Sequence, residues 1–217
     1  MEQPAKKWIS PKEYQEVEAN SQEKIEYFNG NLRMMAGGTF EHSVLCMDVS
    51  AMLFNGLKGK SCMTFNSEMK IEIAQENTYV YPDASVVCGE VEHSEEITGA
   101  IGNPTLIVEV ISSSSKNSDR GPKFHRYRKL PSLQNYLLIY QDKFAVESSY
   151  RHPDSDLWRI DDHEGLDAEF TIQSLDLTIK LSDLYANVKD RIDKMDPPKH
   201  PGLYLVEELV AKYGGKD

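Results

Sequence analysis

Glu109 is the residue whose surroundings most clearly indicate chemistry. It lies within the apolar run of residues 106–111, where burying an unpaired carboxylate costs several kcal/mol. A proton, a cationic partner or a metal ion must therefore compensate its charge, unless it is a strand-end glutamate that reaches solvent or an arginine. Asp83 has the same character, because it follows Pro82 at the start of a second apolar run, residues 84–87. Two carboxylates on neighbouring strands offer the hard oxygen ligands that Mg²⁺ or Mn²⁺ prefers.

The one basic segment of an acidic chain follows these carboxylates. Residues 116–129 contain six Lys or Arg residues and one His against the single acid Asp119. On the helix expected over residues 119–130, Lys123 and Tyr127 are four positions apart and share a face. An ammonium group near a metal ion could orient a water nucleophile or stabilise the charge that develops on a phosphate. For the other basic residues the alternative is a solvent-exposed helix face.

Local signals predict the elements that hold these residues. Ser10-Pro11-Lys12-Glu13 is typical of a capped helix start, and Asn29-Gly30 predicts the turn of a hairpin over residues 25–35. Thr39 is expected to cap a helix over residues 40–57.

Alternating or apolar runs predict the strands. The run over residues 105–111 is apolar on both faces apart from Glu109, so it is expected at the centre of a covered sheet. The predicted class is α+β, with a central mixed β-sheet flanked by helices. The expected strands cover residues 69–73, 79–87, 105–111, 135–140, 144–150, 157–160 and 170–181.

The composition indicates a globular chain. With 217 residues, 40% of them hydrophobic, it can bury an ordinary core without disulfides or a structural metal. We expect one domain over residues 1–195 and a tail over residues 196–217, in which Leu203, Val206, Leu209 and Val210 indicate a short amphipathic helix. No apolar run approaches the ~20 residues of a membrane span, so no membrane partner is expected.

The net charge limits the classes of function that the chain can have, and the cysteines indicate its cellular compartment. A net charge of -11 argues against a general nucleic-acid coating protein but leaves room for a local basic groove. The three widely spaced cysteines, Cys46, Cys62 and Cys88, exclude a disulfide scaffold and a Cys-x-x-Cys zinc site. We expect them to be small core residues. They suit the reducing cytoplasm, and the N-terminal residues lack the apolar stretch of a signal peptide, so a cytoplasmic location is expected.

The ordered combination of several motifs resembles a nuclease family. Pro82-Asp83, Glu109-Val110-Ile111-Ser112 and Asp119-Arg120-Gly121-Pro122-Lys123 are similar to the Uma-two family of endonucleases, within the PD-(D/E)xK superfamily. The likeness covers roughly residues 8–190. It also includes the Glu26–Gly30 hairpin entry, Gly38-Thr39 followed by His42, and the segments 67–70 and 127–134.

The resemblance implies a restriction endonuclease-like core and hydrolysis of DNA that depends on Mg²⁺ or Mn²⁺. By this resemblance, Asp83 and Glu109 bind the metal ion and Lys123 is the catalytic lysine. The superfamily's usual lysine position is Ile111 here, and the family supplies its lysine from the following helix. Ser113 and Pro122 also depart from the family pattern, which usually has proline and often has glutamate at these positions.

Further residues are accessory or DNA-binding candidates. His42 could contact substrate or support a metal ligand, although a histidine packed at a helix start is an equal alternative. Glu68 could form a hydrogen bond near the metal, and Tyr127 shares the face of Lys123. The candidates for DNA contacts are Lys116, Arg120, Arg126 and Arg128.

A second function remains open from the sequence alone. A catalytically silent nuclease-like fold could serve as a DNA- or protein-binding module. The resemblance also makes a homodimer one expected arrangement, since related nucleases often cut two strands with paired subunits.

Overall fold

A six-stranded mixed sheet forms the centre of the computed structural model, which describes residues 8–35, 37–111 and 119–195. Its strand order is β11-β10-β9-β8-β6-β3, with β8 and β9 parallel and every other neighbouring pair antiparallel. The central strand β8 (Leu106–Ile111) is buried along its whole length, as its sequence predicts. The other strands are β3 (Cys62–Asn66), β6 (Ala84–Cys88), β9 (Asn135–Tyr140), β10 (Ala145–Arg151) and β11 (Trp158–Glu164).

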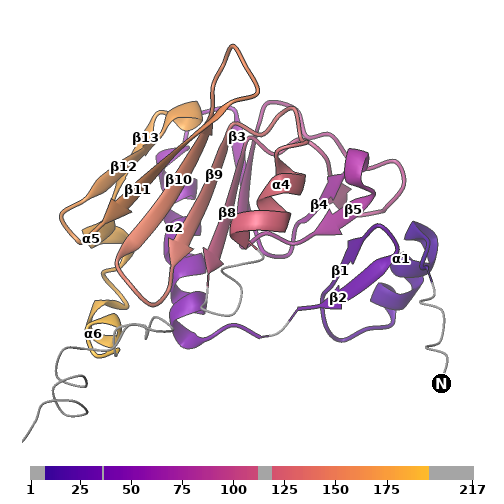
Figure 1. Cartoon of the computed structure of the whole chain (residues 1–217), viewed down its shortest axis with the longest axis horizontal. Helices are drawn as coiled ribbons and strands as arrows, with labels where there is room; N and C mark the ends of the chain where they lie inside the picture. Colours follow the sequence, from indigo (N-terminus) through magenta and orange to yellow (C-terminus); the bar gives the residue numbers. More distant parts are fainter. Residues whose placement is uncertain (1–7, 36, 112–118, 196–217) are drawn as a thin grey trace, which may run out of the picture.

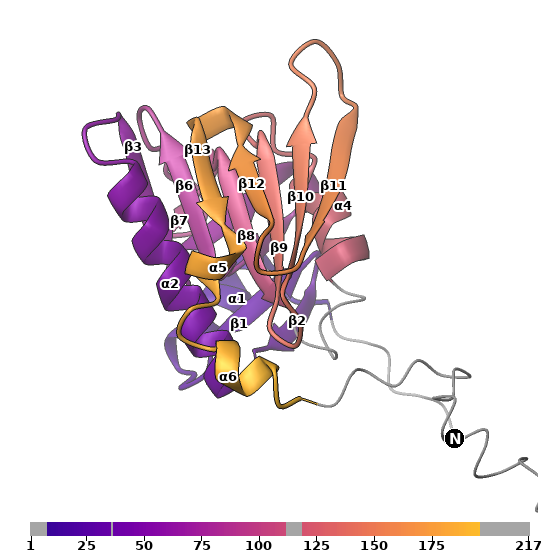
Figure 2. The same ribbon diagram turned by 90° about the vertical axis from the view of Figure 1, so that its left-hand side faces the viewer.

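One face of this sheet is covered by α2 (Phe40–Gly56) and by C-terminal elements, which lie in front of the sheet in Figure 2. Leu45, Val49 and Leu53 of α2 pack with the even-numbered residues of β8. They can do so because successive side chains of a strand point to opposite faces. The C-terminal elements are β12 (Glu169–Ile172), η3 (Gln173–Leu175), β13 (Leu177–Lys180), α5 (Leu181–Leu184) and α6 (Lys189–Ile192).

The opposite face carries a short helical segment and a second sheet, both visible in Figure 1. A π-helical turn, η2 (Asp119–Lys123), continues into α4 (Phe124–Tyr127), whose aromatic residues pack with Ile107 and Ile111 of β8. The second sheet has the order β2-β1-β5-β4-β7. Its elements are β1 (Ile25–Phe28), β2 (Asn31–Met34), β4 (Lys70–Ile73), β5 (Thr78–Val80) and β7 (Ala100–Ile101), with η1 (Ala74–Glu76) between β4 and β5.

The N-terminal signals give the expected structure. In α1 (Pro11–Ala19), the Ser10 side chain accepts from the Glu13 N–H at 3.2 Å and Glu13 accepts from the Ser10 N–H at 2.9 Å. Asn29 and Gly30 have φ values of 41° and 86° between β1 and β2, as a tight hairpin turn requires. Thr39 caps α2 by accepting from the backbone N–H of residue 42 at 3.1 Å.

Three predicted elements differ from the structure. The strand expected over residues 170–181 is a hairpin of β12 and β13 joined by η3, with Asp176 at φ 47° before β13 and α5 beginning at residue 181. In the other two elements a proline lies within the segment that differs. The strand expected over residues 79–87 is divided into β5 and β6, which belong to different sheets. Pro82 lies at the break, because it cannot donate to a strand ladder. The helix expected over residues 119–130 begins as a π-helical turn containing Pro122 and ends at Tyr127.

The expectation that all three cysteines are merely small core residues is wrong for two of them. Cys62 and Cys88 face each other in the antiparallel β3–β6 pair and form a disulfide. Strand β3 was not anticipated from the sequence, so its pairing with β6 could not be foreseen. Cys46 is the free cysteine.

Some predictions lie outside the described residues. The tail helix with Leu203, Val206 and Leu209 is among them, and so is the position of Lys116. Within the described ranges, no helix has both the length and the apolar composition needed to cross a membrane.

Candidate active site

Asp83 and Glu109 lie on one face of the central sheet. The antiparallel β6–β8 register pairs Ala84 with Val108 and Ser85 with Ile107, so one further step along it brings Asp83 opposite Glu109. Asp83 Oδ2 accepts from the backbone N–H of Val110 at 2.7 Å, which fixes the carboxylate at the end of β8. The two acids singled out in the sequence are therefore neighbours.

Glu109 is buried and has two donors on one oxygen. It is 4% exposed, and its Oε1 accepts from the Tyr127 hydroxyl at 2.9 Å and from Lys123 Nζ at 2.7 Å. Burial raises the pKa of Glu109 to about 8, against the opposing effect of Lys123, and the charges of Asp83 and Asp119 raise it further. The Glu109 carboxyl therefore holds a proton more readily than an ordinary glutamate.

Lys123 lies among three carboxylates. Its Nζ is 2.7 Å from Glu109 Oε1, 3.3 Å from Glu26 Oε1 and 4.0 Å from Asp119 Oδ1. Burial lowers the pKa of Lys123, but these carboxylates raise it more, so the net shift is upward and the ammonium keeps its proton. The η2 turn and α4 thus direct Lys123 and Tyr127 to the same carboxyl group, as their four-residue spacing predicts.

Glu26 is a member of this cluster that was not singled out from the sequence. It is 1% exposed on β1, where the hairpin register places it opposite Arg33, whose Nε donates to it at 2.9 Å. Burial raises the pKa of Glu26, but Lys123 and Arg33 together hold it below its usual range. The Asn29-Gly30 turn could have revealed the pairing with Arg33. The approach of Glu26 to Lys123, in contrast, depends on how the two sheets pack against each other.

His42 and Cys46 approach Asp83 from the start of α2. His42 Nε2 is 3.3 Å from Asp83 Oδ1, and Cys46 Sγ is 3.5 Å from His42 Nδ1. The hydrogen bond with Asp83 raises the pKa of His42 despite burial, whereas burial and the Asp83 charge raise the pKa of the Cys46 thiol. All three residues line a cavity of ≈ 460 Å³, together with Lys24 and Ser67.

Glu68 does not contact the described carboxylates around Lys123 or the His42–Asp83 pair. Its carboxylate pairs with Lys24 at 2.7 Å, and its side chain is 73% exposed. It therefore lies beside the cavity-lining residues Lys24 and Ser67 rather than on the carboxylate face.

The candidate DNA contacts have different surroundings. Arg120 donates to Glu147 through Nε at 2.8 Å, so its charge already has a partner. The Arg126 guanidinium lies over the ring of Phe28, 5.1 Å from its centroid. Arg128 is exposed at the end of α4.

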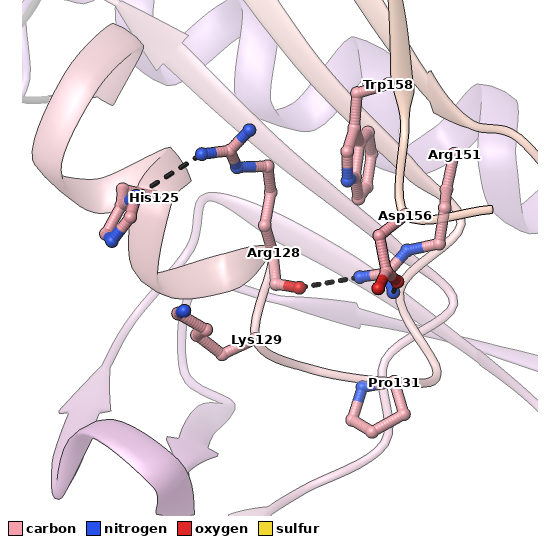
Figure 3. A pocket seen from close by; sticks show the side chains of 7 residues that line it. All are labelled: His125, Arg128, Lys129, Pro131, Arg151, Asp156 and Trp158. Carbon is pink, nitrogen blue, oxygen red and sulfur yellow. Dashed lines mark hydrogen bonds and ion pairs between the residues drawn. The ribbon is translucent and has the colours of Figure 1, made fainter.

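Arg128 belongs to a basic pocket of ≈ 390 Å³, drawn in Figure 3. Its guanidinium lies beside His125, with Nη2 3.2 Å from Nδ1. The pocket also contains Trp158, Arg151 and Lys129, and the Arg151 guanidinium is 5.0 Å from the indole centroid. The exposed end of α4 is thus the part of the basic segment that the described structure leaves open to a polyanion.

The donor set at Asp83 and Glu109 fits a divalent cation. The β6–β8 register brings Asp83 beside Glu109, and the adjoining cavity reaches Asp83. Oxygen ligands of this kind suit Mg²⁺ or Mn²⁺. A cation here would also relieve the repulsion that Asp83 exerts on a charged Glu109.

Comparison with known proteins agrees with the motifs. Residues 11–182 match the Uma2 (Uma-two) family model, described as "Putative restriction endonuclease". Two Synechocystis proteins named uncharacterized protein slr1290 and sll1609 are 35% and 33% identical to this chain. The first match covers 82% of this chain and 91% of slr1290, and the second covers 75% of this chain and 92% of sll1609.

A solved structure shares the fold. It is a crystal structure from Anabaena variabilis described as "a putative nuclease belonging to DUF820", with a TM-score of 0.67 and 18% identity. The match covers 82% of this chain and 98% of that one. The mixed α+β architecture is therefore a nuclease-like fold, and the chain belongs to the Uma2 family of restriction endonuclease-like proteins.

Proposed function

We propose that this chain is a metal-dependent endonuclease that hydrolyses phosphodiester bonds in DNA. The observation that carries the proposal is the placement of Asp83 opposite Glu109, with the Lys123 ammonium 2.7 Å from Glu109. Membership of the Uma2 family supports it. Mg²⁺ or Mn²⁺, when bound by the two carboxylates, supplies an activated water and neutralises charge on the scissile phosphate.

The surrounding groups hold these side chains in place. The Val110 N–H and His42 orient the two oxygens of Asp83, and the Tyr127 hydroxyl orients Glu109. Lys123 provides a fixed positive charge for the phosphate oxygens as negative charge develops on them. Such preorganised charge is worth more in a buried site than in water, because there is little solvent to reorganise.

The experiment that tests this proposal compares two lysine variants. Lys123→Met removes the buried charge while keeping an unbranched side chain, whereas Lys189→Met removes an exposed lysine on α6. We expect single-turnover cleavage at saturating DNA to fall about 10²–10³-fold in the first variant and to stay at the parental rate in the second. DNA binding, measured in Ca²⁺ to prevent hydrolysis, should change only modestly in both. Thermal unfolding of each variant shows whether the buried substitution has disturbed the fold.

Two outcomes would change the proposal. If the folded Lys123→Met variant cuts at the parental rate, the lysine assignment is wrong and Lys116 becomes the candidate. If the parental chain cuts neither plasmid nor single-stranded DNA in Mg²⁺ or Mn²⁺, the fold acts as a binding module instead.

A further inference from the structure

Asp83 also belongs to a second set of ligand atoms, which includes a nitrogen and a sulfur. His42 and Cys46 are four residues apart on α2 and so lie on one face of the helix. Their ligand atoms and a carboxylate oxygen of Asp83 all lie within 4.8 Å of one another. Around Glu109, in contrast, the described residues offer oxygen ligands and the Lys123 ammonium.

Two separations among these atoms are close to those required around one tetrahedral ion. Zinc lies about 2.0–2.1 Å from imidazole nitrogen and carboxylate oxygen and about 2.3 Å from cysteine sulfur. Tetrahedral angles would then separate the nitrogen and oxygen by about 3.4 Å and the nitrogen and sulfur by about 3.6 Å. The observed separations from His42 Nε2 are 3.3 Å to Asp83 Oδ1 and 3.9 Å to Cys46 Sγ.

The chemistry and the access also favour zinc. Thiolate and imidazole ligands select Zn²⁺ over Mg²⁺, which prefers oxygen and an octahedral shell. The three residues line the ≈ 460 Å³ cavity, so an ion can enter and a water molecule can take the fourth position, as in open zinc sites.

We propose that His42, Cys46 and Asp83 form a Zn²⁺-binding site that holds one ion per chain. Asp83 would be shared between this ion and a cation at the Asp83–Glu109 pair, and the two divalent charges would repel each other, so zinc at this site should weaken Mg²⁺ binding at that pair. This competition rests on the proposed function, whereas zinc binding itself does not.

Cobalt provides a direct test, because Co²⁺ accepts the same ligands and absorbs light when bound to a thiolate. The chain has three cysteines, two of which are joined in the Cys62–Cys88 disulfide. In the unreduced protein, a sulfur-to-cobalt charge-transfer band can therefore arise from Cys46 alone. The parental protein should show this band at one Co²⁺ per chain and lose it when Zn²⁺ is added.

Variants then identify the ligands. Cys46→Ser should abolish the band, and both Cys46→Ser and His42→Ala should lower Zn²⁺ affinity by at least roughly 100-fold, since outer-shell partners alone contribute 10–100-fold. Ser43→Ala is the matched control, because Ser43 lines the same cavity but is not in the ligand set. It should bind both metals like the parent.

The parental protein alone can overturn the proposal. Absence of the charge-transfer band at saturating Co²⁺ would show that Cys46 is not a ligand, and unchanged Zn²⁺ affinity in folded Cys46→Ser would show the same. These readouts do not depend on DNA cleavage. If the chain binds zinc through Cys46 but does not cut DNA, the zinc site stands and the proposed nuclease function is wrong. If the chain cuts DNA but shows no charge-transfer band, the nuclease function stands and the zinc site is wrong.

Discussion

The Lys123 ammonium and the Glu109 proton determine the charge at the candidate site. Lys123 is buried among Glu109, Glu26 and Asp119, which keep it positive. Glu109 is buried next to Asp83, which favours its protonated form. A divalent cation at Asp83 and Glu109 must therefore displace a proton, while the positive charge of Lys123 stays in place.

This displacement predicts how Mg²⁺ affinity depends on pH. Burial raises the pKa of Glu109 to about 8, so below that pH the proton competes with the cation. Apparent Mg²⁺ affinity should fall about tenfold for each pH unit below about 8 and level off above it. Calorimetric titrations with Mg²⁺ across this range measure the slope.

The matched variant is Glu109→Gln, which cannot take up or release the proton. Its residual Mg²⁺ affinity should not follow the titration of residue 109. A parental affinity that is constant from pH about 6 to about 9 would contradict the assignment of Glu109 as a metal ligand, because proton and metal would then not compete.

Local signals account for the elements that the sequence predicted well. The Ser10 capping box, the Asn29-Gly30 turn and the Thr39 cap each act within a few residues, so they can be predicted without knowing what packs around them. Buried polar residues in apolar runs likewise revealed Asp83 and Glu109. These signals were enough to place the central strand β8 and its carboxylate.

Features that depend on long-range packing were not visible in the sequence. Glu26 reaches Lys123 only because the smaller sheet lies against the central one. His42 and Cys46 reach Asp83 only because α2 begins near the start of β6. The break at Pro82 carries the chain from one sheet to the other, and no periodicity within the segment indicated that change of partner.

The β3–β6 pair gives a prediction for the disulfide. The Cys62–Cys88 bond closes a loop with a sequence separation of 26, and closing a loop of this length contributes about 3.5 kcal/mol to the free energy of unfolding in the chain-entropy account. Cys62→Ser/Cys88→Ser should lower the free energy of unfolding by up to that amount in urea titrations. Cys46→Ser, which leaves the bond intact, is the control.

A reducing agent should reproduce the effect in the parental protein and leave the double variant unchanged. Equal stability of the parental protein with and without reductant would contradict a stabilising role for the bond.

At the scale of the molecule, the tail is expected to have a partner. On the short helix that the sequence predicts for the tail, the apolar residues Leu203, Val206, Leu209 and Val210 could not bury one another. Docking on the domain or on a second subunit would cover them. Removing residues 197–217 should therefore lower the free energy of unfolding or shift the molecular mass measured by light scattering. If both stay unchanged, these apolar residues do not dock on the domain or on a second subunit.

The distribution of charge determines how the proposed endonuclease would hold DNA. A net charge of -11 disfavours binding over most of the surface, so affinity must come from a local group of cations. Arg128 is exposed in the pocket drawn in Figure 3, and Arg126 lies on the same short helix. Arg120 already pairs with Glu147, so its positive charge is partly neutralised and attracts a phosphate less strongly.

Salt titrations measure this difference. If Arg128 contacts a phosphate, Arg128→Ala should weaken DNA binding and reduce the slope of log affinity against log salt by about 1. The rate of the bound complex should change little, unlike that of Lys123→Met. Lys180→Ala removes an exposed charge from β13, on the opposite face of the sheet, and should leave the slope unchanged. Equal slopes for the parent and Arg128→Ala would place the DNA path away from the end of α4, because each released counterion reports one neutralised phosphate.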